Sequence, residues 1–245
     1  MGHSIQVLRS FPLFQGLTAD EAARIAQLAV PRLLPRRAAV FREGDEVESI
    51  YFVASGLIKT SRTDEKGNEQ IFSFLKQGDM FPLTGRFDAE VSPVTAATVV
   101  ETSLLALPLR SFEQQLLAGS PELAFKMMGL MSGKIRELQD KLLNFNQRSV
   151  EERGISFLIY LAEHFGLERG GEVVVPIPVT HQELASTIGF ARETVSRLLT
   201  SLRKEGIVQV SRKGFVVRNL QTLKEKVCVK ENCPHCRELQ RVGQG

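Results

Sequence analysis

The chain has 245 residues, a length that suits two domains that each bury their own core. Hydrophobic residues make up 43% of the sequence and charged residues 24%, which is typical of a folded globular protein and excludes a disordered or fibrous chain. No apolar run reaches the roughly 18 residues of a membrane span, and the first residues lack the apolar core of a signal peptide. We therefore expect a cytoplasmic protein with no membrane partner.

The net charge of +3 is too small to identify a partner, but the charges are unevenly distributed. Residues 180–224 contain eight basic and three acidic side chains, a local excess of five positive charges. This composition suits a segment that faces the phosphates of a nucleic acid.

Short strands dominate the first part of the chain after a predicted helix at residues 19–29, for which Thr18 is the expected N-cap. Five apolar runs separated by glycine-containing turns are typical of strands. They cover residues 49–53, 57–62, 70–75, 97–101 and 103–108. Antiparallel strands at such close spacing predict a barrel or jelly-roll-like domain, which we expect to end near Leu109.

A long helix is predicted from Pro121, where apolar residues begin to recur in alternating steps of four and three. The stripe consists of Ala124, Met128, Met131, Ile135, Leu138, Leu142 and Phe145. Such spacing over about three heptads predicts a coiled-coil seam and a homodimer, and the alternative is packing on the helix's own domain. Met127, Leu130 and Leu143 lie off the seam and are expected to contact the barrel.

A helix-turn-helix is predicted beyond a further helix at residues 149–166 and a glycine-rich stretch that leads into a strand ending at Pro176. Thr180 and Glu183 have the spacing of a capping box, so a helix should begin at His181. Gly189 permits the tight turn before a second helix at residues 191–205. The residues expected to bury the two helices are Leu184, Ala185, Ile188, Val195, Leu198, Leu199 and Leu202.

The opposite face of the second helix carries a set of polar side chains suited to reading base edges. The set is Arg192, Glu193, Ser196 and Arg197. Arginine can donate two hydrogen bonds to guanine, a carboxylate can accept one from cytosine, and serine can do either. An intrahelical pair between Glu193 and Arg197 is the alternative interpretation.

Two short strands after this helix, at residues 207–210 and 215–217, predict a wing. Its tip carries Arg212 and Lys213, which are expected to contact phosphate. Thr180 and His181, at the start of the first helix, complete the predicted DNA-binding residues.

All three cysteines, Cys228, Cys233 and Cys236, lie within nine residues of one another near the end of the chain, with His235 beside them. An odd number of cysteines in a cytoplasmic chain argues against a disulfide framework. Three chemistries remain open: an iron–sulfur cluster with a fourth ligand from elsewhere, zinc bound by three cysteines and His235, or free thiols that form a redox disulfide. A thiol oxidoreductase is not expected, because the C-x-x-C spacing lies in a tail rather than at a helix start in a βαβ unit.

These features together resemble the CRP/FNR family of bacterial regulators, from about Phe14 to Leu220. The resemblance rests on the glycine pattern of the barrel, the long helix and above all the segment VTHQELASTIGFARETVSRLLTSLRKEGIV. It implies an α+β chain in four parts: a sensory β-roll over residues 1–120, a dimerisation helix over 121–148, a winged helix-turn-helix over 149–222 and a cysteine-containing tail over 223–245.

The resemblance also implies a function. A dimer of this family reads an inverted-repeat operator in double-stranded DNA and contacts RNA polymerase as an activator or repressor. Residues at the reading positions match those of members that recognise a TGA-containing half-site. A two-fold symmetric protein places such half-sites about 10–10.5 bp apart.

The nature of the signal is the part that the family pattern leaves most open. Cyclic-nucleotide members carry a glutamate for the ribose and an arginine for the phosphate, whereas this chain has Pro82-Leu83-Thr84 and Glu90-Val91-Ser92-Pro93 in those regions. An anionic phosphate would meet no cation there, so we do not expect cyclic AMP as the effector.

Some FNR-like regulators of Gram-positive bacteria carry a C-terminal cysteine group with an Asn-Cys-Pro segment, as at Asn232-Cys233-Pro234. By this resemblance the cysteines would bind an oxygen-sensing 4Fe-4S cluster, with Asp140 or His235 as the fourth ligand, although their spacing here differs. The alternative is a small organic effector in the β-roll, with the cysteines binding structural zinc or acting as a thiol switch.

Overall fold

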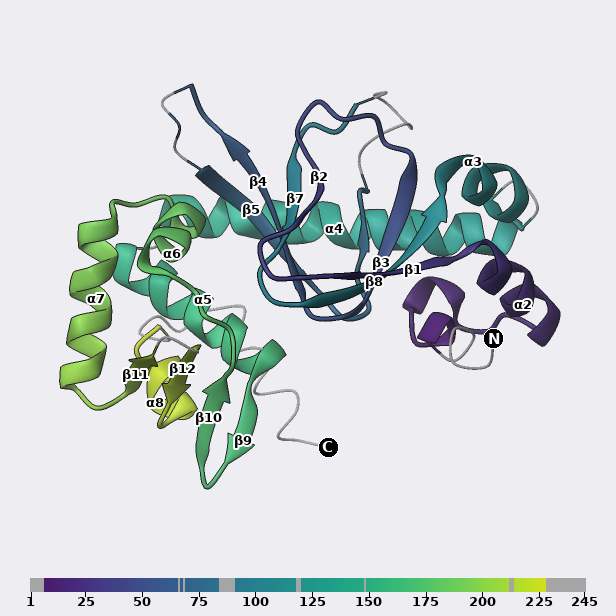
Figure 1. Ribbon diagram of the computed structural model, residues 1–245. Coiled ribbons are helices and arrows are strands. Elements are labelled where there is room, and N and C mark those ends of the chain that lie inside the picture. Colours follow the sequence, from purple (N-terminus) through teal and green to yellow (C-terminus); the bar gives the residue numbers. More distant parts are fainter. Residues whose placement is uncertain are drawn as a thin grey trace. The chain divides into compact units, whose positions relative to one another are not determined.

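The computed structural model describes residues 7–65, 67, 69–83, 91–117, 120–147, 149–211 and 214–227. The chain forms two compact units, Met1–Leu143 and Asn144–Gly245, whose elements are labelled in Figure 1. The predicted fold class is confirmed: antiparallel β-sheets precede helices and a C-terminal helix-turn-helix. None of the helices in the described ranges combines the length and the apolar character that crossing a membrane requires.

After a helical segment at residues 7–9, the first unit continues with two short helical elements, η1 (Pro12–Phe14) and α2 (Ala19–Leu28). Thr18 caps α2 as predicted: its hydroxyl accepts from the Glu21 amide at 3.3 Å, and the Glu21 carboxylate accepts from the Thr18 amide at 2.9 Å. The hydrogen bond from that amide lowers the pKa of Glu21. A local motif of four residues is therefore sufficient to set where α2 begins.

Two four-stranded antiparallel sheets follow, with strand orders β1-β8-β3-β6 and β2-β7-β4-β5. We call this pair of sheets the β-roll. Its strands are β1 (Val30–Leu34), β2 (Ala39–Phe41), β3 (Ser49–Ser55), β4 (Leu57–Thr63), β5 (Glu69–Lys76), β6 (Met80–Phe81), β7 (Thr95–Thr98) and β8 (Thr102–Pro108).

All five predicted runs contain strands, but the run at residues 97–101 was placed too late along the chain. Its strand, β7, ends at Thr98, whose hydroxyl donates to the Pro35 carbonyl at 2.6 Å, and the Val99 amide then donates to Leu57 at 2.8 Å. These long-range bonds turn the chain away despite the β-branched residues that follow. The strands β1, β2 and β6 were not predicted, because the first contains a proline and the others are only three and two residues long.

Two clusters form the core of this unit. One lies between the two sheets and includes Val53, Ile58 and Leu104. The other joins β3 and β8 to the N-terminal elements and to helix α4 (Pro121–Gln147), and it contains Phe14, Phe52, Phe112 and Met127 among its buried residues. Between β8 and α4 the chain passes through α3 (Leu109–Ser111) and η2 (Phe112–Leu117).

Helix α4 divides its apolar residues between its own domain and solvent. Met127 is buried in the second cluster and Leu130 packs against it, as predicted for residues off the seam. Met131 also packs against this cluster, although the heptad pattern places it on the seam. Residues four positions apart lie on the same face of an α-helix, so Met131 lies beside Met127 and faces the same cluster.

Three other seam residues are exposed, Met128 at 51%, Ile135 at 56% and Leu138 at 46% accessible, whereas Ala124 is half-buried. Phe125, which the pattern did not include, is 71% accessible. The side chains of Leu142, Leu143 and Phe145 lie outside the described part of the chain.

The second unit combines helices with one sheet of strand order β11-β12-β10-β9. Its elements are α5 (Val150–Phe165), β9 (Leu167–Arg169), β10 (Glu172–Val175), α6 (His181–Ile188), α7 (Arg192–Lys204), β11 (Val208–Ser211), β12 (Gly214–Val217) and α8 (Leu220–Glu225). The glycine-rich stretch was expected to lead into a single strand, but it forms the hairpin β9–β10, in which Glu172 pairs with Arg169.

Candidate nucleic-acid interface

The predicted helix-turn-helix consists of α6, a tight turn and α7. The Thr180 hydroxyl accepts from the Glu183 amide at 3.1 Å, and the Glu183 carboxylate accepts from the Thr180 amide at 2.9 Å, so α6 begins at His181 as predicted. The helix ends at Gly189, which has a φ of +74° and donates its amide to Ala185. A side chain at this position would be strained, which explains why the turn uses glycine.

Helix α7 is held by the apolar face that its sequence predicts. Val195, Leu198, Leu199 and Leu202 are all buried. On α6 the predicted residues Leu184, Ala185 and Ile188 are buried as well. Because both helices direct their apolar faces inward, the orientation of the remaining α7 side chains is determined.

The polar set on α7 lies on the other face. Arg192, Glu193 and Arg197 are exposed and Ser196 is half-buried. In the described part of the chain, no ion pair or hydrogen bond joins Glu193 to Arg197. The alternative interpretation, an intrahelical pair, therefore has no support, and these charged groups are available to a partner.

The predicted wing is the hairpin of β11 and β12, in which Val208 pairs with Val217 and Ser211 with Gly214. β12 also pairs with β10, so the wing is part of the sheet rather than an isolated hairpin. Arg212 and Lys213, the residues predicted to contact phosphate, lie outside the described residues.

The predicted metal ligands cannot be placed in the same way. Cys228, Cys233, His235 and Cys236 lie beyond the last described residue, and the side chain of Asp140 is also outside the description. Among the residues that the structure does describe, no group of three or more histidine, cysteine, aspartate or glutamate side chains could hold a metal ion.

Helix α8 attaches the chain just before Cys228 to the second unit. Leu223 is fully buried, and Lys224 forms an ion pair with Glu163 at 2.7 Å. Lys226 pairs at 2.7 Å with Glu205, the C-cap of α7, and this hydrogen bond lowers the pKa of Glu205. The tail thus starts from a point held beside the C-terminal end of α7.

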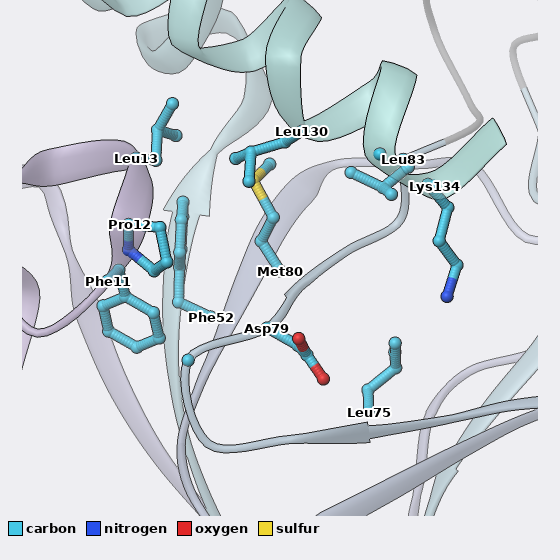
Figure 2. Close-up of a pocket in the computed structure, with 12 residues that line it drawn as sticks. Phe11, Pro12, Leu13, Phe52, Leu75, Asp79, Met80, Leu83, Leu130 and Lys134 are labelled. Atoms are coloured by element: carbon cyan, nitrogen blue, oxygen red, sulfur yellow. The ribbon is translucent and has the colours of Figure 1, made fainter. Parts of the chain in front are cut away.

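A cavity of about 260 Å³ lies in the first unit, between the N-terminal elements, the β-roll and α4 (Figure 2). Its lining is mainly apolar and includes Phe11, Leu13, Phe52, Leu75, Met80, Leu83 and Leu130. Asp79 and Lys134 are the charged residues of the lining, and Figure 2 shows Lys134 extending from the same helix as Leu130. Sequence patterns did not reveal this cavity, because its residues come from distant segments of the chain.

Two family models match the chain, one in each unit. The Cyclic nucleotide-binding domain model matches residues 31–118, and the Crp-like helix-turn-helix domain model matches residues 152–226. The second match covers α6, the turn, α7 and the wing.

The curated relatives are bacterial regulators. The transcriptional activator protein FnrA of Stutzerimonas stutzeri is 31% identical over 192 residues, which cover 78% of this chain and 77% of the relative. The anaerobic regulatory protein of Bacillus subtilis (strain 168) is 26% identical over 219 residues, 89% of this chain and 92% of the relative. The CRP-like cAMP-activated global transcriptional regulator of Mycobacterium tuberculosis (strain ATCC 25618 / H37Rv) is 25% identical over 218 residues, 89% and 97% of the two chains.

Solved structures share the fold. TTHA1359, a transcriptional regulator of the CRP/FNR family from Thermus thermophilus, aligns with a TM-score of 0.68 over 81% of this chain and 98% of that chain. The sequence identity over this alignment is 23%.

Proposed function

Because this chain belongs to the CRP/FNR family of transcription regulators, we propose that it is a homodimer that reads an inverted-repeat DNA operator through the exposed face of α7. It then acts on transcription through contact with RNA polymerase. The observation that carries the proposal is the capped α6–turn–α7 arrangement, which buries the apolar residues of α7 and leaves Arg192, Glu193 and Arg197 exposed and unpaired with one another.

The chemistry of this face suits the major groove. An arginine that donates both hydrogen bonds to guanine discriminates against other bases by about 1–3 kcal/mol, and Glu193 can accept from a cytosine amino group. Ser196 on α7, and Thr180 and His181 at the start of α6, are expected to add further contacts. The expected operator carries TGA-containing half-sites separated by about one helical turn, 10–10.5 bp.

Dimer formation through α4 is supported by the exposed apolar side chains of Met128, Ile135 and Leu138. We expect Ile135→Glu to raise the dimer dissociation constant about tenfold or more, because a buried seam would then hold two unpaired carboxylates. Sedimentation equilibrium measures this constant. Arg136→Gln is the matched control, since it changes the charge by the same amount at an exposed neighbour off the seam. If the Ile135→Glu protein dimerises as tightly as the wild type, α4 does not form the dimer contact through this stripe.

In this proposal the cysteine-containing tail is the part of the chain that senses the signal. Three thiolates of Cys228, Cys233 and Cys236, with Asp140 or His235, have the donor chemistry for a 4Fe-4S cluster, which when bound makes a protein sensitive to oxygen. A relative from Bacillus subtilis is named anaerobic regulatory protein, which supports a response to oxygen. Iron and sulfide analysis of anaerobically purified protein tests it, and colourless protein with stoichiometric zinc contradicts it.

Selection of bound DNA from a random pool tests the function as a whole. Protein prepared without air is expected to select an inverted repeat, and protein exposed to air should bind the selected sequence more weakly. If no symmetric sequence is enriched, the proposal that the protein recognises a DNA operator is wrong. If the operator is bound equally well with and without air, the DNA-binding function is supported and the proposed oxygen response is wrong.

A second candidate signal is favoured by the cavity in the first unit. Its apolar lining suits a small organic molecule with an apolar body better than a cyclic nucleotide. Ser92, near the phosphate region of cyclic-nucleotide members, uses its hydroxyl within its own turn, donating to Val94 at 2.8 Å. Equilibrium dialysis with octanoate and with cyclic AMP shows which of the two ligands binds. This candidate would be favoured if regulation did not depend on oxygen and if the Cys233→Ser variant still regulated transcription.

A further inference from the structure

Arg153, near the start of α5, contacts the turn between the two helices of the helix-turn-helix. Its guanidinium carbon lies 5.0 Å from the centroid of the Phe190 ring, and Nη1 donates to the Ile188 carbonyl at 3.5 Å. Ile188 is the last residue of α6, and Phe190 lies two residues before α7. One side chain from a third helix therefore contacts both sides of Gly189.

These contacts of Arg153 restrain the conformation of the turn between α6 and α7. The last carbonyls of a helix lack partners within the helix, and a cation near them is favourable because of the helix dipole. A guanidinium over an aromatic face adds a directional contact. Gly189 and Phe190 both donate their amides to Ala185, so two backbone bonds and the contacts of Arg153 together hold the turn.

The next residue of α5 explains why the helices meet at this point. A Cβ atom added at Gly154 would collide with Cδ2 of Leu198 and would lie 3.7 Å from Cδ1 of Ile188. Leu198 belongs to α7 and Ile188 to α6, so the glycine allows α5 to approach both helices. Arg153 and Gly154 together place the first turn of α5 against the junction of α6 and α7.

We propose that Arg153 is a positioning residue for sequence-specific DNA binding: it sets the orientation of α7, and with it the base-reading side chains, without contacting DNA. The inference rests on the proposed function. Because Arg192 follows Phe190 by only two residues, a shift of the turn displaces the first turn of α7, where base contacts are expected. Contacts with phosphate depend mainly on charge and are less sensitive to such a shift.

The test compares Arg153→Met with wild-type protein in fluorescence anisotropy titrations on the selected operator and on a non-specific duplex at several salt concentrations. Arg153→Met should weaken operator binding about tenfold, while non-specific affinity and the slope of log K against log salt stay unchanged. The operator affinity of Arg153→Lys should lie between those of the wild type and Arg153→Met, because lysine keeps the charge but loses the planar group that stacks on Phe190. Arg169→Met, on the exposed strand β9, is the matched control and should bind as wild type.

Phe190→Leu tests the same contact from its aromatic side, and it replaces Arg153→Met in the experiment if that variant does not fold. It should also reduce specificity, and the double variant should bind no more weakly than Arg153→Met alone, because Phe190→Leu removes a contact that Arg153→Met has already removed. A salt slope reduced by about one unit per subunit, or about two for the dimer, would show that Arg153 contacts phosphate itself. Operator affinity within about twofold of wild type, or additive losses in the double variant, would also overturn the proposal. A wild-type protein that selects no operator would instead refute the proposed function.

Discussion

Arg197→Ala is expected to cost about 1–3 kcal/mol of operator binding at each half-site, and a dimer carries the change twice. Arg197 is exposed in the second turn of α7, on the face opposite Val195 and Leu198, and it pairs with no acid among the described residues. Its removal deletes a donor pair without disturbing the core. Anisotropy titrations on operators with each half-site base changed in turn would locate the lost contact, since discrimination should disappear at one base position only.

The matched control for this prediction is Arg203→Ala. Arg203 is also exposed and lies on the same helix, six residues further toward its C-terminus, or about 9 Å along the axis. We expect it to weaken specific and non-specific binding alike and only slightly, through loss of charge. An Arg197→Ala variant that loses affinity equally for every sequence would mean that Arg197 binds phosphate and does not read a base.

Gly214→Ala is expected to destabilise the second unit by about 4 kcal/mol or more, a loss typical of severe backbone clashes. Gly214 has a φ of +146°, and a Cβ added there would collide with the Val175 carbonyl oxygen and lie 3.0 Å from the Ile177 amide nitrogen. Both are backbone atoms of the neighbouring chain segment, so no side-chain rotation can relieve the contact. Hydrogen exchange should show lost protection in β10, β11 and β12 while the β-roll stays protected.

Gly206→Ala separates the clash from backbone strain. Gly206 also has a positive φ, +73°, but a Cβ there would meet nothing within 4 Å. Only the left-handed conformation is penalised, at about 1–2 kcal/mol. If both alanine variants unfold at the same denaturant concentration, the close approach of β12 to β10 does not govern the stability of this unit.

The first residues of the helices show how much of this structure can be predicted from local sequence. Thr18 and Thr180 were each predicted as caps from a hydroxyl followed three residues later by glutamate, and both form the complete capping box. Ser149 and Glu152 form a third one. All the groups involved lie within four residues, so the pattern needs no tertiary information. The buried face of α7 was equally predictable from its 3.6-residue period.

Strand boundaries and shared helix faces were less predictable, because their determinants are distant in sequence. The end of β7 depends on bonds from Thr98 and Val99 to Pro35 and Leu57, more than 40 residues away. On α4 the heptad pattern could not separate Met131, which packs on its own domain, from exposed Ile135. Which apolar residue faces which neighbour is decided by the surfaces that the fold brings together.

The candidate interface was identified from sequence because a capped helix, a glycine turn and an amphipathic helix are encoded within 25 consecutive residues, 180–204. The cavity beside Lys134 and the contact of Arg153 with Phe190 had no such signal. Their residues are separated by tens of positions and meet only when helices and strands pack. Amino-acid order by itself therefore determined which helical face is polar and where each helix starts, whereas packing between distant segments decided what holds that face in position.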